Sequence, residues 1–387
     1  RGRLSAVILL SLLAQAWAGD TGQQRLAAAQ DIVKASGFTG GLVVHVGDGA
    51  GLKTADFMTH EPSIVHGLCS TRRQVHEART LIRQRKAYGK VSVQYWDQSD
   101  LPYADNTVNL LVAEVFVSPD EVMRVLVPRG VAYIKSDRGW KKTVKPWPPE
   151  IDEWTHYLHG PDNNAVAHDT IVGVPRQVQW IGQPKFARSH EQLASVSAMV
   201  SAHGRHFAIV DEGLTADIRM PVRWHLIARD AFNGVILWKR AIDQWSDHLH
   251  GFRSGPPDLP FRLVAHGDRV YLPLGADKPV TALNAATGKE VVTYPGSEQV
   301  RQIIHAGKRL IMLTGTSQVS IHMQPANRAT AQRSIMVAEA DTGKLLWRKD
   351  VSKDTLLPLV MSGAALLYQT SEQLVCLALA SGNENWR

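Results

Sequence analysis

The second half of the chain repeats one short pattern four times, and this repeat limits the fold more than any other feature. Each copy is an apolar run, a polar turn ending in glycine, and a second run that in three copies ends in tryptophan. A hairpin signal with glycine at its turn precedes each copy. The glycines recur about every 40–55 residues, which predicts a β-propeller or a β-solenoid. The copies lie at residues 228–238, 282–292, 337–347 and 376–386.

These copies resemble the tryptophan-docking motif of pyrroloquinoline-quinone-type propellers, Ala-x-Asp-x-x-Thr-Gly-x-x-x-Trp. The resemblance covers residues 195–387 and implies an all-β quinoprotein-type β-propeller over 176–387, with about four blades present. In that family each tryptophan packs between neighbouring blades. We therefore expect a structural, blade-docking role for Trp238, Gly288, Trp347 and Trp386. Val292 replaces one tryptophan, and its smaller side chain should loosen that contact.

The propeller is expected to be incomplete. The segment 176–181 suits a strand that closes a ring with a final blade, so we expect the natural protein to continue beyond Arg387. Family dehydrogenases hold the quinone between an aromatic ring and a disulfide of adjacent cysteines, beside calcium. Cys69 and Cys376 are far apart in the sequence, so we do not expect quinone binding. A quinone-dependent dehydrogenase is the weakest functional alternative.

The first half alternates strand-like and helix-like segments. Apolar runs at 42–46, 64–68, 91–95, 108–112 and 130–134 are separated by segments that suit helices, including 71–86 and 119–126. This alternation predicts an α/β Rossmann-like domain with a parallel sheet over residues 19–140. The first strand leads into a glycine turn, Gly47-Asp48-Gly49-Ala50-Gly51, where backbone amides can approach a ligand closely.

Residues 41–135 resemble a class I S-adenosylmethionine-dependent methyltransferase. The resemblance rests on the glycine turn, on Trp96-Asp97, and on the segments 101–109 and 124–130. It implies that the turn holds the methionine part of the cofactor and that Asp97 lies near its adenine. The predicted cofactor-binding residues are therefore Gly47, Asp48, Gly49, Gly51, Cys69 and Asp97.

Three positions depart from that family. His45 and Asn109 stand where the family usually carries acids, and Cys69 replaces the acid that accepts both ribose hydroxyls. A thiol is a weak acceptor, and losing two bonds to a carboxylate weakens binding by roughly 2–4 kcal/mol. We therefore expect a degenerate domain with no assigned catalytic residue. An S-adenosylmethionine-dependent methyltransferase is the alternative function, and S-adenosylmethionine is the one cofactor it would use.

Residues 141–175 read as a linker rich in proline and histidine. His156 and His159, with Asp152, Glu153 or His168, could ligate a metal, because imidazole and carboxylate both bind zinc. No HExxH or CxxC motif anchors such a site. The preferred interpretation is a polar surface segment that packs against the neighbouring domain, and no metal site is assigned.

Residues 1–18 have the layout of a secretory signal peptide: a basic start, an apolar run and a small-x-small cleavage site. We expect an exported, periplasmic or envelope-associated protein with no membrane span after cleavage. The net charge of +7 specifies no nucleic acid. The leading hypothesis is a binding or scaffold protein whose propeller surface contacts a protein or polysaccharide. It would resemble the propeller subunit of the bacterial outer-membrane barrel assembly machine.

Overall fold

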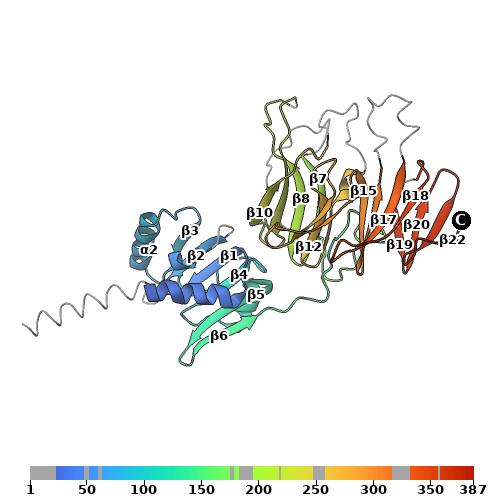
Figure 1. Ribbon diagram of the computed structural model, residues 1–387. Coiled ribbons are helices and arrows are strands. Elements are labelled where there is room, and N and C mark those ends of the chain that lie inside the picture. Colours follow the sequence, from blue (N-terminus) through green and yellow to red (C-terminus); the bar gives the residue numbers. More distant parts are fainter. Residues whose placement is uncertain are drawn as a thin grey trace, which may run out of the picture. The chain divides into compact units, whose positions relative to one another are not determined.

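The computed structural model divides into two compact units, Arg1–Pro148 and Pro149–Arg387 (Figure 1). It describes residues 23–47, 52–59, 63–174, 178–182, 195–217, 219–246, 258–315, 332–355 and 358–387. The predicted signal peptide lies outside these residues, as do Asp48, Gly49 and Gly51 of the glycine turn. Within the described part of the chain, every helix is too short or too polar to cross a bilayer.

The first unit is built on one six-stranded sheet in the order β3-β2-β1-β4-β5-β6 (Figure 1). Neighbouring strands from β3 to β5 are parallel, and β6 is antiparallel to β5. The order reverses between β1 and β4, so the predicted Rossmann-like fold is confirmed. The strands are β1 (Gly41–Val46), β2 (Ser63–Cys69), β3 (Val91–Tyr95), β4 (Val108–Ala113), β5 (Leu126–Ser136) and β6 (Gly139–Val144).

The parallel strands are buried on both faces, as their apolar sequences require. Alternate residues of β1 enter different cores: Val43 packs in one, and Val44 and Val46 pack in the other. Residues 23–36 form a helix that contributes to the first core. The other helical elements are the 3-10 turn η1 (Thr54–Phe57), α2 (Arg72–Gln84) and α3 (Pro119–Val125). Thr71 starts α2 through a reciprocal capping pair with Gln74.

Strand β6 extends the sheet beyond the five predicted strands. Its residues 141–144 belong to the segment expected as a linker, yet they pair with Val131–Ile134 of β5. The cause is local, because β5 and β6 form a hairpin. Gly139 takes φ +103° at its turn, and Lys142 and Lys135 lie over the rings of Tyr133 and Trp140.

The second unit contains four four-stranded antiparallel sheets, each in sequence order, among its described residues (Figure 1). This agrees with the prediction of about four propeller blades. A 3-10 turn, η2 (Leu259–Arg262), precedes the second sheet. The strands are β7 (Val196–Ala202), β8 (Arg205–Asp211), β9 (Trp224–Asp230), β10 (Ile236–Ala241), β11 (Val264–His266), β12 (Arg269–Pro273), β13 (Val280–Asn284), β14 (Glu290–Tyr294), β15 (Val300–Ala306), β16 (Arg309–Thr314), β17 (Arg333–Glu339), β18 (Leu345–Val351), β19 (Val360–Ser362), β20 (Ala365–Gln369), β21 (Leu374–Ala378) and β22 (Glu384–Trp386).

Indole rings join successive sheets in a constant geometry. Trp238 of the first sheet covers Gly288 of the second, where an added Cβ would lie 2.7 Å from the ring. Its Nε1–H donates to the Ala285 carbonyl oxygen at 2.9 Å, three residues before that glycine. Trp347 covers Gly382 and donates to the Leu379 carbonyl in the same way. Only glycine fits under the ring, and its φ is positive.

Trp180 makes the equivalent contact with the first sheet. It covers Gly234 and donates to the Ala231 carbonyl oxygen at 3.0 Å. The described residues 178–182 form no strand, although the sequence suggested one for 176–181. Trp386, the tryptophan of the fourth motif copy, is 48% exposed in β22.

The contact at Val292 is not loosened in the way that the sequence suggested. Val292 covers Gly343, and Tyr294, two residues further along β14, turns its hydroxyl to the Ala340 carbonyl oxygen at 2.5 Å. Ala340 lies three residues before Gly343, so the tyrosine supplies the hydrogen bond that an indole supplies elsewhere. Tyr294 is 1% exposed. Valine and tyrosine together therefore replace the missing tryptophan.

Candidate functional site

The carboxyl ends of β1, β2 and β4 form the place where Rossmann-like sheets bind ligands. Open α/β sheets bind at the point where strand order reverses, outside the carboxyl ends of the strands. Here that point lies between β1 and β4. Gly47 follows β1, Glu114 follows β4, and Cys69 ends β2.

His45 occupies this switch point from β1. Its ring is 3% exposed, and its two nitrogens lie 3.0 Å from Thr54 Oγ1 and 3.2 Å from Glu114 Oε1. Lys135 Nζ lies 3.3 Å from the other oxygen of Glu114. Burial acts to raise the pKa of Glu114, but His45 and Lys135 hold it below its ordinary value. The result is a polar network in which His45 and Glu114 are buried, Lys135 is half exposed, and each side chain has a partner.

Cys69 stands where the methyltransferase resemblance implies a ribose-binding acid. The thiol is free and 5% exposed. Burial raises its pKa, and the positive charge of Lys53 opposes that rise only in part. A buried protonated thiol is a weak hydrogen-bond acceptor and an unreactive nucleophile.

A small pocket lies between the sheet and the elements η1 and α2. Its volume is about 80 Å³, and its walls include His45, Gly47, Lys53, Cys69 and Glu77. Sites for ligands of cofactor size usually measure about 300–1,000 Å³. The space that the described residues enclose here is therefore smaller than such sites.

Two further predicted positions lie away from this pocket. Asp97 is exposed and accepts hydrogen bonds from the amide and hydroxyl of Ser99, which lower the pKa of its carboxyl. Asn109 lies at the start of β4, and its Oδ1 accepts from the amide of Leu42 at 2.8 Å. It fixes the beginning of β1, at the opposite end of the strand from the crevice.

The polar segment after Pro149 packs on the propeller sheets. Backbone and side-chain groups of residues 154–161, here called the crossing segment, bond to the first strand of all four sheets. Ser201 of β7, Ala265 of β11 and Met361 of β19 donate amides to the carbonyls of Trp154, Thr155 and Pro161. The amide of His305, in β15, donates to His156 Nε2 at 3.0 Å. The expectation of packing was correct for these residues.

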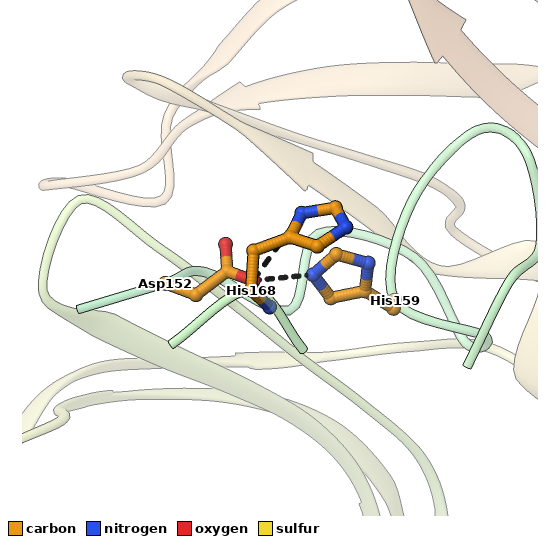
Figure 2. Close-up of side chains that lie close together, drawn as sticks. All are labelled: Asp152, His159 and His168. Atoms are coloured by element: carbon orange, nitrogen blue, oxygen red, sulfur yellow. Dashed lines mark hydrogen bonds and ion pairs between the residues drawn. The ribbon is translucent and has the colours of Figure 1, made fainter. Parts of the chain in front are cut away.

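Three polar side chains of this region converge beside the crossing segment (Figure 2). One ligand-capable atom from each of Asp152, His159 and His168 lies within 4.8 Å of the other two. His159 Nε2 is 2.7 Å from Asp152 Oδ2, and the amide of His168 donates to the same oxygen at 2.7 Å. Burial acts to raise the pKa of Asp152, but these bonds keep it low.

The other candidates of this region do not join the cluster. Glu153 turns its carboxylate to the amide of His203 at 2.6 Å. His156 bonds to β15, as described.

Sequence reasoning missed Thr54 and Glu114, the partners of His45, and Lys135, the partner of Glu114. An acid directly after the fourth strand was the available signal, since strand ends gather at the switch point of such sheets. Thr54 and Lys135 carry no such signal, because the fold brings them to His45 and Glu114 through packing alone.

The fold and the repeat contacts define a Rossmann-like unit joined to sheets of a quinoprotein-type propeller. Residues 223–387 match the family model described as outer membrane protein assembly factor BamB. The predicted pyrroloquinoline-quinone-type repeats are thereby confirmed for this region. No curated protein matches the sequence.

Solved structures resemble parts of the chain at low similarity. A Methanococcus maripaludis protein proposed to be an S-adenosyl-L-methionine-dependent methyltransferase is 20% identical, with a TM-score of 0.26 over 28% of this chain and 53% of its own. The [4+2]-cyclase SpnF is 23% identical, with a TM-score of 0.25 over 28% of this chain and 43% of its own. The quinohemoprotein alcohol dehydrogenase of Comamonas testosteroni is 12% identical, with a TM-score of 0.37 over 60% of this chain and 40% of its own. The chain thus spans about half the length of these proteins, and the fold assignment rests on the strand order and the repeats.

Proposed function

We propose that this chain is an exported binding or scaffold protein and that its methyltransferase-like unit does not catalyse methyl transfer. The observation that carries the proposal is the closed network of His45, Glu114 and Lys135 at the switch point. It occupies the place from which a cofactor would be held, and Cys69 supplies no carboxylate beside it. The propeller then provides the binding surface, for a protein or a polysaccharide.

The sequence of the propeller supports the same proposal. The two cysteines of the chain are Cys69, in the Rossmann-like unit, and Cys376, in the propeller, so this sequence has no adjacent pair like that of quinone dehydrogenases. The motif tryptophans Trp238 and Trp347 are engaged in joining sheets. A family model named for an outer-membrane assembly factor matches this region, which favours an envelope location.

Calorimetric titration of the whole chain with S-adenosylmethionine tests the proposal. We expect no saturable heat up to about 1 mM, since a compact pocket and a missing carboxylate both weaken binding. The matched variant is Cys69→Asp, which restores an acid at the end of β2. Micromolar binding by the unaltered chain would instead support the alternative, an S-adenosylmethionine-dependent methyltransferase, and defeat the scaffold proposal for this unit.

Export is tested separately. Residues 1–40 fused to a reporter enzyme that is active only outside the cytosol should give activity. Replacing Ala16 and Ala18 with arginine removes the small-x-small site and should leave the precursor uncleaved. A fusion that stays cytosolic would contradict export.

A further inference from the structure

The residues Asp152, His159 and His168 form a cluster that the propeller sheets do not use. The crossing segment is attached to the sheets through Trp154, Thr155 and His156 and their neighbours, none of which belongs to the cluster. The side chains of Asp152 and His159 point toward each other, with the His168 ring beside them, and their hydrogen bonds run within the cluster or to adjacent backbone (Figure 2). This arrangement is available for a ligand.

The local backbone holds His159 in its place. Its φ is +70°, a left-handed conformation that costs a residue other than glycine of the order of 1 kcal/mol. The amides of Thr155 and His156 donate to its carbonyl oxygen, and its own amide donates to the His156 carbonyl. The indole of Trp154 packs edge-on against its ring at 5.2 Å. The ring is therefore fixed before any ligand arrives.

Asp152 is oriented in a comparable way. The amide of Glu153 donates to Oδ1 and the amide of His168 donates to Oδ2, each at 2.7 Å. These bonds aim Oδ2 at the Nε2 atom of His159. The hydrogen bond from its own amide also holds His168 at the cluster, where its Nδ1 lies 4.0 Å from Asp152 Oδ2.

We propose that Asp152, His159 and His168 bind a divalent transition metal of the zinc class, with water completing the coordination. Zinc takes imidazole nitrogen and carboxylate oxygen at about 2.0–2.2 Å, which places neighbouring ligand atoms about 3.4 Å apart. Asp152 Oδ2 and His159 Nε2, now 2.7 Å apart in a hydrogen bond, would separate by about 0.7 Å to reach that spacing. The side chain of His168 is 75% exposed, so it can turn inward without disturbing the core. Two imidazoles favour zinc, cobalt, nickel or copper over calcium and magnesium.

A metal ion at this cluster would cross-link the two ends of the segment 152–168, which precedes the first propeller sheet. Asp152 lies before the crossing segment and His168 after it, so one ion closes the loop that touches all four first strands. A ligand that binds only the folded form stabilises that form. The metal would act on the propeller unit alone.

The test uses the full chain, without a histidine tag and stripped of metal by a chelator, titrated with Zn²⁺ by calorimetry. We expect one ion per chain with a Kd of about 10 µM or below. Co²⁺ should give the visible absorption of a nitrogen- and oxygen-coordinated ion. Ca²⁺ should give no saturable heat.

Variants decide whether the assigned residues are the ligands. His168→Ala and Asp152→Asn should each weaken Zn²⁺ binding at least tenfold, and the control His76→Ala, an exposed histidine of α2, should not change it. His168 is exposed, so its replacement leaves the fold intact, which far-ultraviolet circular dichroism checks. Absence of saturable Zn²⁺ binding below 1 mM, or unchanged affinity in both variants, would overturn the proposal. Neither result depends on S-adenosylmethionine binding.

Discussion

Tyr294 shows how one residue takes over the contact of another. At three contacts an indole N–H donates to the carbonyl three residues before a glycine: Ala231, Ala285 and Leu379. At the remaining contact the hydroxyl of Tyr294 donates to Ala340. Arg269 donates to that oxygen as well, at 2.9 Å. The acceptor is thus the constant part of the interface, and the donor can vary.

Tyr294→Phe should lower the free energy of unfolding by about 0.5–1.5 kcal/mol, the usual net value of a hydrogen bond. The loss stays modest because Arg269 still satisfies the Ala340 carbonyl. Urea denaturation measures it. Tyr88→Phe is the control, since Tyr88 is 68% exposed in the other unit. A loss equal to that of the control would show that the hydroxyl contributes nothing.

His156 should make stability depend on pH. Burial, followed by the nearby charges of His305, His266 and His159, lowers its pKa to about 3. The His305 amide donates to its Nε2, so the proton sits on Nδ1, which faces Thr155 Oγ1 at 2.8 Å. A second proton, on Nε2, would place its N–H against the amide N–H of His305.

The sign follows from these contacts. Below the ordinary histidine pKa near 6.5, the unfolded chain takes up a proton that folded His156 refuses, down to about pH 3. The contribution of His156 to the free energy of unfolding is therefore complete above about pH 6.5. As the pH falls below that value, it decreases by about 1.4 kcal/mol per pH unit. His156→Gln should flatten that slope in urea titrations between pH 4 and 7. The exposed control His76→Gln should not, and equal slopes in both would contradict the assignment.

Among the elements, the tryptophan contacts and the packing of the polar segment were predictable, but the bonds of the crossing segment to all four first strands were not. The recurrence of glycine and tryptophan in the repeat, as at Gly288 and Trp238, reports blade geometry directly, because only glycine can lie under an indole. The switch-point network needs Thr54 and Lys135, which no local pattern marks. The cluster of Asp152, His159 and His168 depends on a left-handed histidine and a backbone amide, and neither has a sequence signature.

Trp238→Ala should destabilise the propeller unit by about 3–5 kcal/mol, because it removes a large ring packed between two sheets together with its hydrogen bond. Gly288→Ala should also be strongly destabilising, since the new Cβ meets that ring and the φ of +68° disfavours alanine. The matched control is Trp386→Ala, where the ring is 48% exposed. Chemical denaturation followed by circular dichroism gives all three values, and a Trp386 effect equal to that of Trp238 would refute the docking role.

At the scale of the whole molecule, the hydrophobic clusters of the two units share no residue. Those of the first unit lie within residues 29–140, and those of the second within 198–379. Each unit therefore has its own core, which is the condition for independent unfolding. We expect scanning calorimetry of the full chain to show two transitions.

Single substitutions should assign these transitions. Val112→Ala, in the core of the Rossmann-like unit, should lower one transition, and Trp238→Ala should lower the other. Zn²⁺ at 100 times its Kd should raise only the transition that Trp238→Ala lowers, by an amount equivalent to about 2.7 kcal/mol. Because Asp152, His159 and His168 all lie in the second unit, a zinc effect on the transition sensitive to Val112 would place the ion elsewhere. A single transition shifted by both substitutions would show instead that the two cores unfold together.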